Sequence, residues 1–300
     1  MKILLFGKNG QVGWELQRSL APLGEVLAPD RRGGDWCGDL FDLDGLRDTV
    51  MQLRPDVIVN AAAYTAVDQA ENDAAVAHAV NAQAPGVLAE AAAVLGAWLV
   101  HYSSDYVFDG SGSRPWVEDD MTGPLNVYGR TKLEGENRIK LACPKHLILR
   151  TGWVHSARRG NFAKTMLCLA REREVLTVVD DQFGAPTGAD LLADVTAHML
   201  LRTRDPGGAT FAGTYHAAAA GETSWHGYAS FVLERASAAG MALQASSATV
   251  KPVPTAAFPA LAERPHNSRL STAKLQNAFG LRFPDWQSGV ARMLGGMAGC

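Results

Sequence analysis

Tyr128 and Lys132 lie four residues apart in the segment "YGRTK", so a helix would carry both side chains on one face. A free tyrosine has a pKa of about 10 and exchanges its proton poorly near neutral pH. A lysine ammonium one helical turn away favours the phenolate and lowers that pKa. Ser104, in "HYSSDYVFDG", adds a hydroxyl that would bond a substrate carbonyl beside Tyr128. We therefore predict that Tyr128, Lys132 and Ser104 are catalytic residues.

Three glycines stand at every third position, Gly7, Gly10 and Gly13, between the apolar run "KILLF" and a helical pattern. Such a loop permits a tight turn and brings the backbone close to a pyrophosphate at the helix N-terminus. Its last glycine lets the helix pack on the sheet. The spacing GxxGxxG is typical of short-chain dehydrogenases. The loop therefore predicts a bound nicotinamide dinucleotide.

The choice between NADH and NADPH depends on the end of the second predicted strand. Asp30 follows Gly13 by 17 residues, where an acidic side chain binds the adenosine ribose hydroxyls. Arg31 and Arg32 come next, and a guanidinium there would hold the 2′-phosphate of NADPH. The sequence leaves both cofactors open, and we expect use of both.

Short apolar strands alternate with helical patterns through the first half of the chain. This alternation predicts βαβ units and a parallel sheet that is covered on both faces. The fold class is therefore α/β, a Rossmann-type doubly wound parallel sheet with a smaller C-terminal substrate-binding lobe. We predict a dinucleotide-binding domain over 1–155, to which later segments return, and a lobe mainly over 156–300. The stretch 245–265, with four prolines, is predicted as a surface loop. The expected strands are 2–7, 25–30, 56–62, 97–104 and 146–154, and the expected helices include 11–24, 43–55, 128–142, 160–174, 189–202 and 225–240.

The composition excludes several classes of partner. The 300 residues carry a formal net charge of −3 and no Lys/Arg block longer than a pair, which argues against nucleic acid and anionic membranes. The four cysteines form no CxxC pair, which disfavours zinc and disulfides and indicates a reducing, cytoplasmic location. His101 stands in an apolar pattern that favours a packed or hydrogen-bonded core histidine over a metal ligand.

A set of motifs along the whole chain resembles the dTDP-4-dehydrorhamnose reductase family, which are extended short-chain dehydrogenases/reductases. The motifs are "GKNGQVGWEL", "NAAAYTAVDQAE", "HYSSDYVFDG", "PLNVYGRTKLEGE", "RTGWVHSARRGNFAKTML", "DDQFGAPTGADLLAD" and "RPHNSRLSTAKL". The resemblance implies NAD(P)H-dependent reduction of the C4 keto group of dTDP-4-dehydro-L-rhamnose to dTDP-L-rhamnose. This is a step of sugar-nucleotide biosynthesis for cell-surface polysaccharide.

The resemblance also implies roles for individual residues. Tyr128 becomes the acid, and Lys132 becomes its electrostatic partner and ribose anchor. This chain has Ser104 where the family usually has threonine, and Tyr64 where histidine is common. The implied cofactor-binding residues are Gly7, Gly10, Gln11, Val12, Gly13, Asp30, Arg31, Asp39, Leu40, Ala62, Ala63, Tyr64, Thr65, Tyr128 and Lys132. The implied substrate-binding residues are Ser104, Asp105 and Trp153.

Two further residues, Glu15 and Asp190, match acidic positions of a divalent-ion site that the family has at a dimer interface. The resemblance therefore suggests Mg²⁺ there and a homodimer. A solvated helix face is the alternative interpretation of these carboxylates.

Related activities are separated by chemistry. A 4,6-dehydratase needs an Asp-Glu pair after the serine or threonine, and here the pair reads Asp105-Tyr106, which excludes it. A sugar-nucleotide 4-epimerase or related reductase uses the same tyrosine and lysine and stays open. A non-catalytic, reductase-like regulatory subunit also stays open, although the intact Ser104, Tyr128 and Lys132 argue against it.

Overall fold

The fold is taken from a computed structural model that describes residues 1–32 and 34–298. Cys300 lies outside the described residues. The other three cysteines, Cys37, Cys143 and Cys168, are free thiols.

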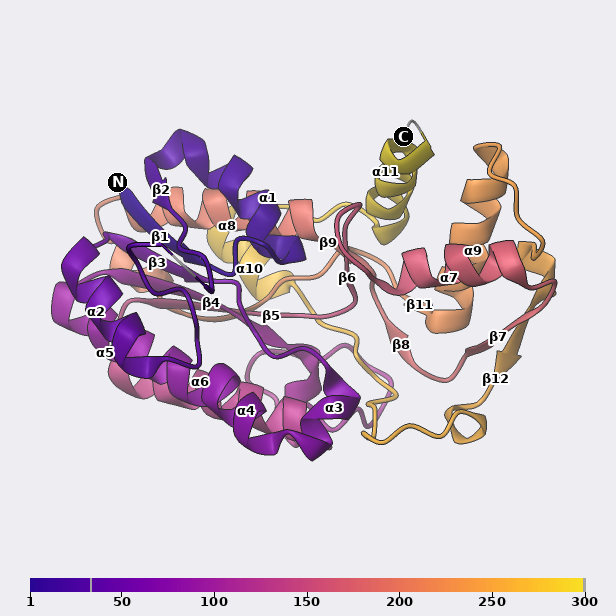
Figure 1. Cartoon of the computed structure of the whole chain (residues 1–300), viewed down its shortest axis with the longest axis horizontal. Helices are drawn as coiled ribbons and strands as arrows, with labels where there is room; N and C mark the ends of the chain where they lie inside the picture. The colour runs from indigo at the N-terminus through magenta and orange to yellow at the C-terminus, as the bar shows by residue number, and fades with distance from the viewer. Residues whose placement is uncertain (33, 299–300) are drawn as a thin grey trace.

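A six-stranded sheet forms the centre of the molecule (Figure 1). All neighbouring strands are parallel, in the order β10-β5-β4-β3-β1-β2. The chain order reverses beside β1, and ligands of open α/β sheets bind at the carboxyl ends of strands near such a switch point. The strands are β1 (Lys2–Phe6), β2 (Glu25–Leu27), β3 (Val57–Asn60), β4 (Trp98–Ser104), β5 (His146–Thr151) and β10 (Gly213–His216).

Helices cover both faces of this sheet, which explains why its strands are continuously apolar. Ile3 and Leu5 of β1 pack on one face, against α1 (Gln11–Leu20), α8 (Ala189–Thr203) and α10 (Ala273–Phe279). Leu4 and Phe6 pack on the other, against α2 (Leu43–Leu53), α5 (Ala84–Leu95) and α6 (Val127–Ala142). The predicted doubly wound α/β fold is confirmed.

Between β3 and α5 the chain forms α3 (Val67–Asn72), α4 (Ala74–His78) and a π-helical turn, η2 (Ala79–Gln83). The buried Asn81 of this turn binds the backbone of Tyr64 and the hydroxyl of Thr131 on α6. This contact fixes the loop after β3 against α6, beside the ends of the strands.

Segments after residue 155 serve both parts of the molecule. β10, α8 and α10 belong to the sheet unit, whereas the smaller lobe lies to its right in Figure 1 around a separate apolar core. The lobe consists of α7 (Phe162–Glu172), α9 (Trp225–Ala238), α11 (Trp286–Ala298), β7 (Leu176–Val179), β8 (Phe183–Gly184), β11 (Thr223–Ser224) and β12 (Val250–Val253). Two short strands, β6 (Val154–His155) and β9 (Thr187–Gly188), pair near the junction.

The prediction of a surface loop over 245–265 is wrong for residues 250–253. β12 pairs in parallel with β7, and its Val250 is buried in the lobe's core. The sequence analysis did not predict this strand because it contains Pro252, and proline is disfavoured within sheets. Here the two-stranded ribbon leaves β12 with a free edge, where proline is tolerated.

No helix among residues 1–32 and 34–298 has the length and apolar character that crossing a membrane requires.

Candidate active site

A cavity of about 940 Å³ opens at the carboxyl ends of the central strands and reaches the smaller lobe. It brings together residues that the sequence analysis took from seven separate segments. The predicted site residues that line it are Gly7, Gly10, Gln11, Val12, Arg31, Asp39, Leu40, Ala62, Ala63, Tyr64, Thr65, Ser104, Asp105, Tyr128, Lys132 and Trp153. Gly13, Asp30, Glu15 and Asp190 are not among the lining residues.

The glycine loop forms one wall of the cavity. Gly7 has φ +87°, and a Cβ there would lie 2.6 Å from the Ala62 nitrogen, so only glycine fits beside the end of β3. A Cβ on Gly13 would overlap the Gly7 carbonyl, which places this glycine in the packing of α1 on the loop. Gly10 is the N-cap of α1 and supplies no side-chain acceptor. The helix N-terminus is therefore available to an anion such as a pyrophosphate.

Asp30 is placed differently from the other predicted cofactor residues. Its strand ends at Leu27, so Asp30 lies in an exposed loop, where Lys8 binds its Oδ2 at 2.9 Å. Asn9 donates to the other carboxylate oxygen at 3.3 Å. The hydrogen bond from Lys8 lowers the pKa of Asp30. Sequence analysis missed Lys8 and Asn9, although their places between the glycines were a usable signal.

Arg31 lines the cavity and forms an ion pair with Asp39, with 3.2 Å between Arg31 Nε and Asp39 Oδ1. Both side chains are predicted cofactor residues, and here they bind each other. Arg32 is exposed and is not among the lining residues.

Tyr128 and Lys132 lie one turn apart at the start of α6. The Asn126 side chain caps this helix by accepting from the Gly129 nitrogen at 2.8 Å. Burial raises the pKa of Tyr128 to about 12, whereas a hydrogen bond with Ser104 acts in the opposite direction. Burial also lowers the pKa of Lys132 to about 8. Desolvation therefore favours the neutral forms of both groups.

Ser104, the last residue of β4, is held by two contacts. Its Oγ accepts from the Tyr106 nitrogen at 3.1 Å and donates to Asp105 Oδ1 at 3.0 Å. Asp105 is buried, and its Oδ2 has no hydrogen-bond partner. Burial raises the pKa of Asp105 to about 6. The serine hydroxyl, the tyrosine and a carboxyl group therefore meet at one wall of the cavity.

Trp153 connects the two parts of the molecule across the cavity. It adopts φ +52°, which is rare for a bulky residue. Such strained backbone conformations cluster at functional sites. Its ring stacks on Trp225, the first residue of α9, with centroids 3.5 Å apart. Trp225 and Arg159 also line the cavity. From the sequence, Trp225 has two open interpretations, stacking on a thymine or deoxysugar and packing, and Arg159 has no assigned role, because nothing local indicates that α9 and the loop before α7 reach the strand ends.

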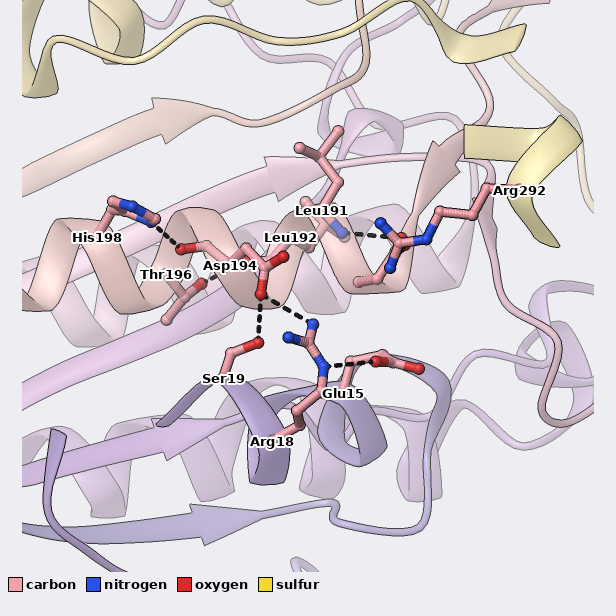
Figure 2. A network of polar contacts seen from close by, with 10 residues as sticks. Glu15, Arg18, Ser19, Leu191, Leu192, Asp194, Thr196, His198 and Arg292 are labelled. Atoms are coloured by element: carbon pink, nitrogen blue, oxygen red, sulfur yellow. Dashed lines mark hydrogen bonds and ion pairs between the residues drawn. The ribbon is translucent and has the colours of Figure 1, made fainter. Parts of the chain in front are cut away.

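Glu15 and Asp190, the carboxylates of the suggested divalent-ion site, each form an ion pair with an arginine of the same chain. Glu15 binds Arg18 on the same helix, with 3.5 Å between Arg18 Nε and Glu15 Oε2 (Figure 2). Asp190 Oδ2 binds Arg292 of α11 at 2.9 Å. Asp190 Oδ1 accepts from the Leu191 nitrogen. Nowhere in residues 1–32 and 34–298 do three or more His, Cys, Asp or Glu side chains gather as metal ligands. Each carboxylate is thus paired with a guanidinium, and the residues present do not fit Mg²⁺.

The parallel sheet, the glycine loop at its switch point and the serine, tyrosine and lysine at the strand ends are the arrangement of the short-chain dehydrogenases/reductases. A sequence profile of the family described as RmlD substrate binding domain matches residues 1–298, and the chain belongs to this family.

Named relatives cover almost the whole chain. A dTDP-4-dehydrorhamnose reductase from Shigella flexneri is 56% identical over 295 residues, which cover 98% of this chain and 97% of that protein. The crystal structure of a dTDP-4-dehydrorhamnose reductase from Clostridium acetobutylicum ATCC 824 has a TM-score of 0.88 at 33% identity, and the match covers 99% of both chains. The enzyme of that name from Bacillus anthracis str. Ames, in complex with NADP, has a TM-score of 0.86 at 33% identity and covers 98% of this chain and 99% of its own.

Proposed function

We propose that this protein reduces the C4 keto group of dTDP-4-dehydro-L-rhamnose to give dTDP-L-rhamnose, with NADPH or NADH as the reductant. The observation that carries the proposal is the meeting of Ser104, Tyr128 and Lys132 in one cavity beside the glycine loop. The 56% identity to the Shigella flexneri protein of this name, over nearly the whole chain, supports the substrate.

The cavity fits a dinucleotide. The cradle at Gly7 would be filled by a Cβ, and the N-terminus of α1 has no side-chain cap. The glycine loop, Gln11 and Val12 would hold the pyrophosphate, Asp39 and Leu40 the adenine, and Ala62 to Thr65 the middle of the cofactor. When bound, the reduced nicotinamide supplies the hydride that C4 accepts.

The protein's own side chains handle the oxygen of the keto group. In this proposal the Ser104 hydroxyl turns its hydrogen from Asp105 to O4, and Tyr128 gives O4 its proton. Burial keeps the Tyr128 phenol protonated at neutral pH, which is the state that an acid requires. Lys132 stabilises the phenolate that remains and binds the ribose. Asp105 and Trp153, which line the cavity, would contact the sugar nucleotide.

The function is tested by product identification. The protein is incubated with a panel of 4-keto-6-deoxy sugar nucleotides and each reduced cofactor, and the products are identified by NMR. Tyr128→Phe, which removes the acid and keeps the ring, is expected to turn over about 10²–10⁴-fold more slowly while it still binds cofactor. A wild-type protein that consumes no cofactor would instead be a regulatory subunit. Interconversion of C4 epimers without net cofactor consumption would indicate an epimerase.

The cofactor part of the proposal is dual use with a preference for NADPH. Lys8 partly neutralises Asp30, which weakens repulsion of a 2′-phosphate, and Arg31 needs only to leave Asp39 to bind that phosphate. The NADP complex of the Bacillus anthracis relative supports this choice.

Arg31→Ala should raise KM for NADPH about 10- to 100-fold, since a charged hydrogen bond contributes about 1.5–3 kcal/mol, and should barely change KM for NADH. Arg32→Ala, at the exposed neighbour, is the matched control. Equal effects of Arg31→Ala on both cofactors, or strict NADH dependence of the parent, would contradict the preference.

We further propose that the protein is a cytoplasmic enzyme whose substrate is a small sugar nucleotide. The free thiols of Cys37, Cys143 and Cys168 support a reducing compartment. A homodimer is part of the same proposal, and sedimentation equilibrium measures it.

A further inference from the structure

A buried polar chain lies behind the catalytic lysine. Asn60 is the last residue of β3, and His101 stands opposite it on β4. Lys132 reaches them from α6, and all three side chains are at most 1% exposed. Lys132 Nζ contacts His101 Nε2 at 3.1 Å, and His101 Nδ1 contacts Asn60 Nδ2 at 3.2 Å. Such a row of buried polar groups needs a consistent set of donors and acceptors.

The backbone decides which way the Asn60 amide points. Asn60 Oδ1 accepts from the Ala62 nitrogen at 3.1 Å, so the Asn60 NH₂ group faces His101. His101 Nδ1 must then be the acceptor, and the hydrogen of the neutral ring is on Nε2. Burial and Lys132 together lower the pKa of His101, so a second ring proton is disfavoured. The ring therefore presents an N–H to Lys132.

This arrangement affects the number of protons on Lys132. Lys132 Nζ donates to the Tyr102 carbonyl at 2.7 Å. A neutral amine can also accept from His101 Nε2, but an ammonium has no lone pair and would face that N–H as a second donor. Protonation of Lys132 thus requires the His101 hydrogen to move to Nδ1, at the cost of the bond from Asn60.

The other charged or titratable groups around Lys132 are already engaged. Glu136, on the same helix, favours the ammonium, but its carboxylate binds Arg150 of β5 at 2.9 and 2.7 Å and Lys140 at 3.1 Å. Burial raises the pKa of Tyr128 while Ser104 opposes that rise, and the same serine donates to Asp105 at 3.0 Å. From η2, the neutral Asn81 binds Thr131. Within residues 1–32 and 34–298, His101 is the side chain that contacts Lys132 Nζ within hydrogen-bond distance.

We propose that His101, held in one tautomer by Asn60, is a positioning residue that controls the proton on Lys132 Nζ. Ala62, whose nitrogen orients Asn60, lines the same cavity as Lys132. The chain Ala62–Asn60–His101–Lys132 therefore couples the turn beside the predicted cofactor site to the charge of the catalytic lysine. The catalytic consequence rests on the proposed function, whereas the proton equilibrium of Lys132 does not.

Two substitutions supply Lys132 with an acceptor. In His101→Gln the amide can turn its oxygen toward the ammonium. In Asn60→Asp a carboxylate accepts from both Ala62 and His101 Nδ1–H, which leaves Nε2 as an acceptor for Lys132. Each variant is expected to raise the pKa of Lys132 by about 1 pH unit, because hydrogen bonds to the charged form favour it. The alkaline limb of the kcat profile should move upward by the same amount.

The direct measurement is a pH titration of the lysine ¹³Cε resonances in cofactor-free protein, with the Lys132 signal assigned by its loss in Lys132→Met. This readout needs no turnover, so a failure of the proposed function stays distinguishable. Thr196→Val, which removes a buried 2.6 Å bond to Tyr102 on the opposite sheet face, is the structural control and should leave the Lys132 titration unchanged. An unchanged or lowered pKa of Lys132 in folded His101→Gln and Asn60→Asp would overturn the proposal.

Discussion

Asp105 has one carboxylate oxygen bonded to Ser104 and the other buried without a partner. Burial raises the pKa of Asp105 from 3.8 to about 6. Burial likewise favours the neutral forms of Tyr128, by raising its pKa, and of Lys132, by lowering its pKa. At the scale of single residues, desolvation rather than a charged neighbour is the largest influence on these three groups. The site is thus poised to bind a ligand that restores hydrogen bonds to them.

A pH dependence of stability follows for Asp105. The folded protein holds this proton more tightly than the unfolded chain, so the stability contributed by the neutral carboxyl is complete below about pH 4. It is lost as the pH rises through about 6, and amounts to on the order of 3 kcal/mol. Asp105→Asn should remove this loss. The measurement is the difference in urea-derived free energy of unfolding between variant and parent from pH 4 to 7.

The free energies of unfolding of Asp105→Asn and its parent are subtracted because His155 also titrates in the folded state. Burial lowers its pKa to about 4, which opposes the effect of Asp105 over the same range. That contribution is common to both proteins and cancels. A free-energy difference that does not change with pH would refute the raised pKa of Asp105.

The junction of β1 and α1 shows how one element can need glycine for two different reasons. At Gly13 a Cβ would overlap the Gly7 carbonyl, which is backbone and has no freedom to move aside. At Gly10 a Cβ would lie 3.3 Å from that same oxygen, which a small adjustment accommodates. Gly13 is therefore required for packing, whereas Gly10 lines the cavity.

Gly13→Ala and Gly10→Ala separate these roles. Gly13→Ala should destabilise the fold by about 1–3 kcal/mol, the usual cost of overpacking, as measured by chemical unfolding. Gly10→Ala should leave stability nearly unchanged and weaken dinucleotide binding, as measured by titration calorimetry with NADPH. The assignment fails if Gly10→Ala proves to be the more destabilising of the two.

At the scale of the whole molecule, ion pairs join surfaces that are remote in sequence. Arg18 of α1 binds Asp194 of α8 at 2.9 Å (Figure 2). Asp190 of α8 binds Arg292 of α11 at 2.9 Å. The second pair links a helix of the sheet unit to a helix of the smaller lobe. Both arginine side chains are more than half exposed, so each pair contributes little, about 0–1 kcal/mol.

Arginine guanidinium groups form ion pairs with Glu15 and Asp190. We therefore expect that neither the stability nor the activity of the protein depends on a divalent metal. Addition of EDTA or of Mg²⁺ is expected to leave both Tm and the rate of cofactor oxidation unchanged, measured at constant ionic strength. A Tm that rises with Mg²⁺ in the parent but not in Asp190→Asn would show that a cation site forms after all.

Much of the fold could be predicted because its signals are local. Continuous apolar strands, helical repeats and the glycines of the first loop are each contained in a few residues, and they indicate a covered parallel sheet. β12 was missed because Pro252 contradicts a strand unless the edge position is known. The sequence leaves Trp225 open between packing and stacking on a ligand, because its stacking partner, Trp153, belongs to a distant segment.

The sequence by itself determined the sheet, the dinucleotide loop and the spacing of Tyr128 and Lys132, since each depends on neighbours along the chain. Tertiary structure decided what each side chain touches. Lys132 meets His101 across 31 positions, and Arg18 meets Asp194 across 176. Contacts between distant segments also produce the burial that sets the protonation of Asp105, Tyr128 and Lys132. Desolvation and long-range pairing come from packed surfaces that no local pattern specifies, so the charge state of this site follows from the fold as a whole.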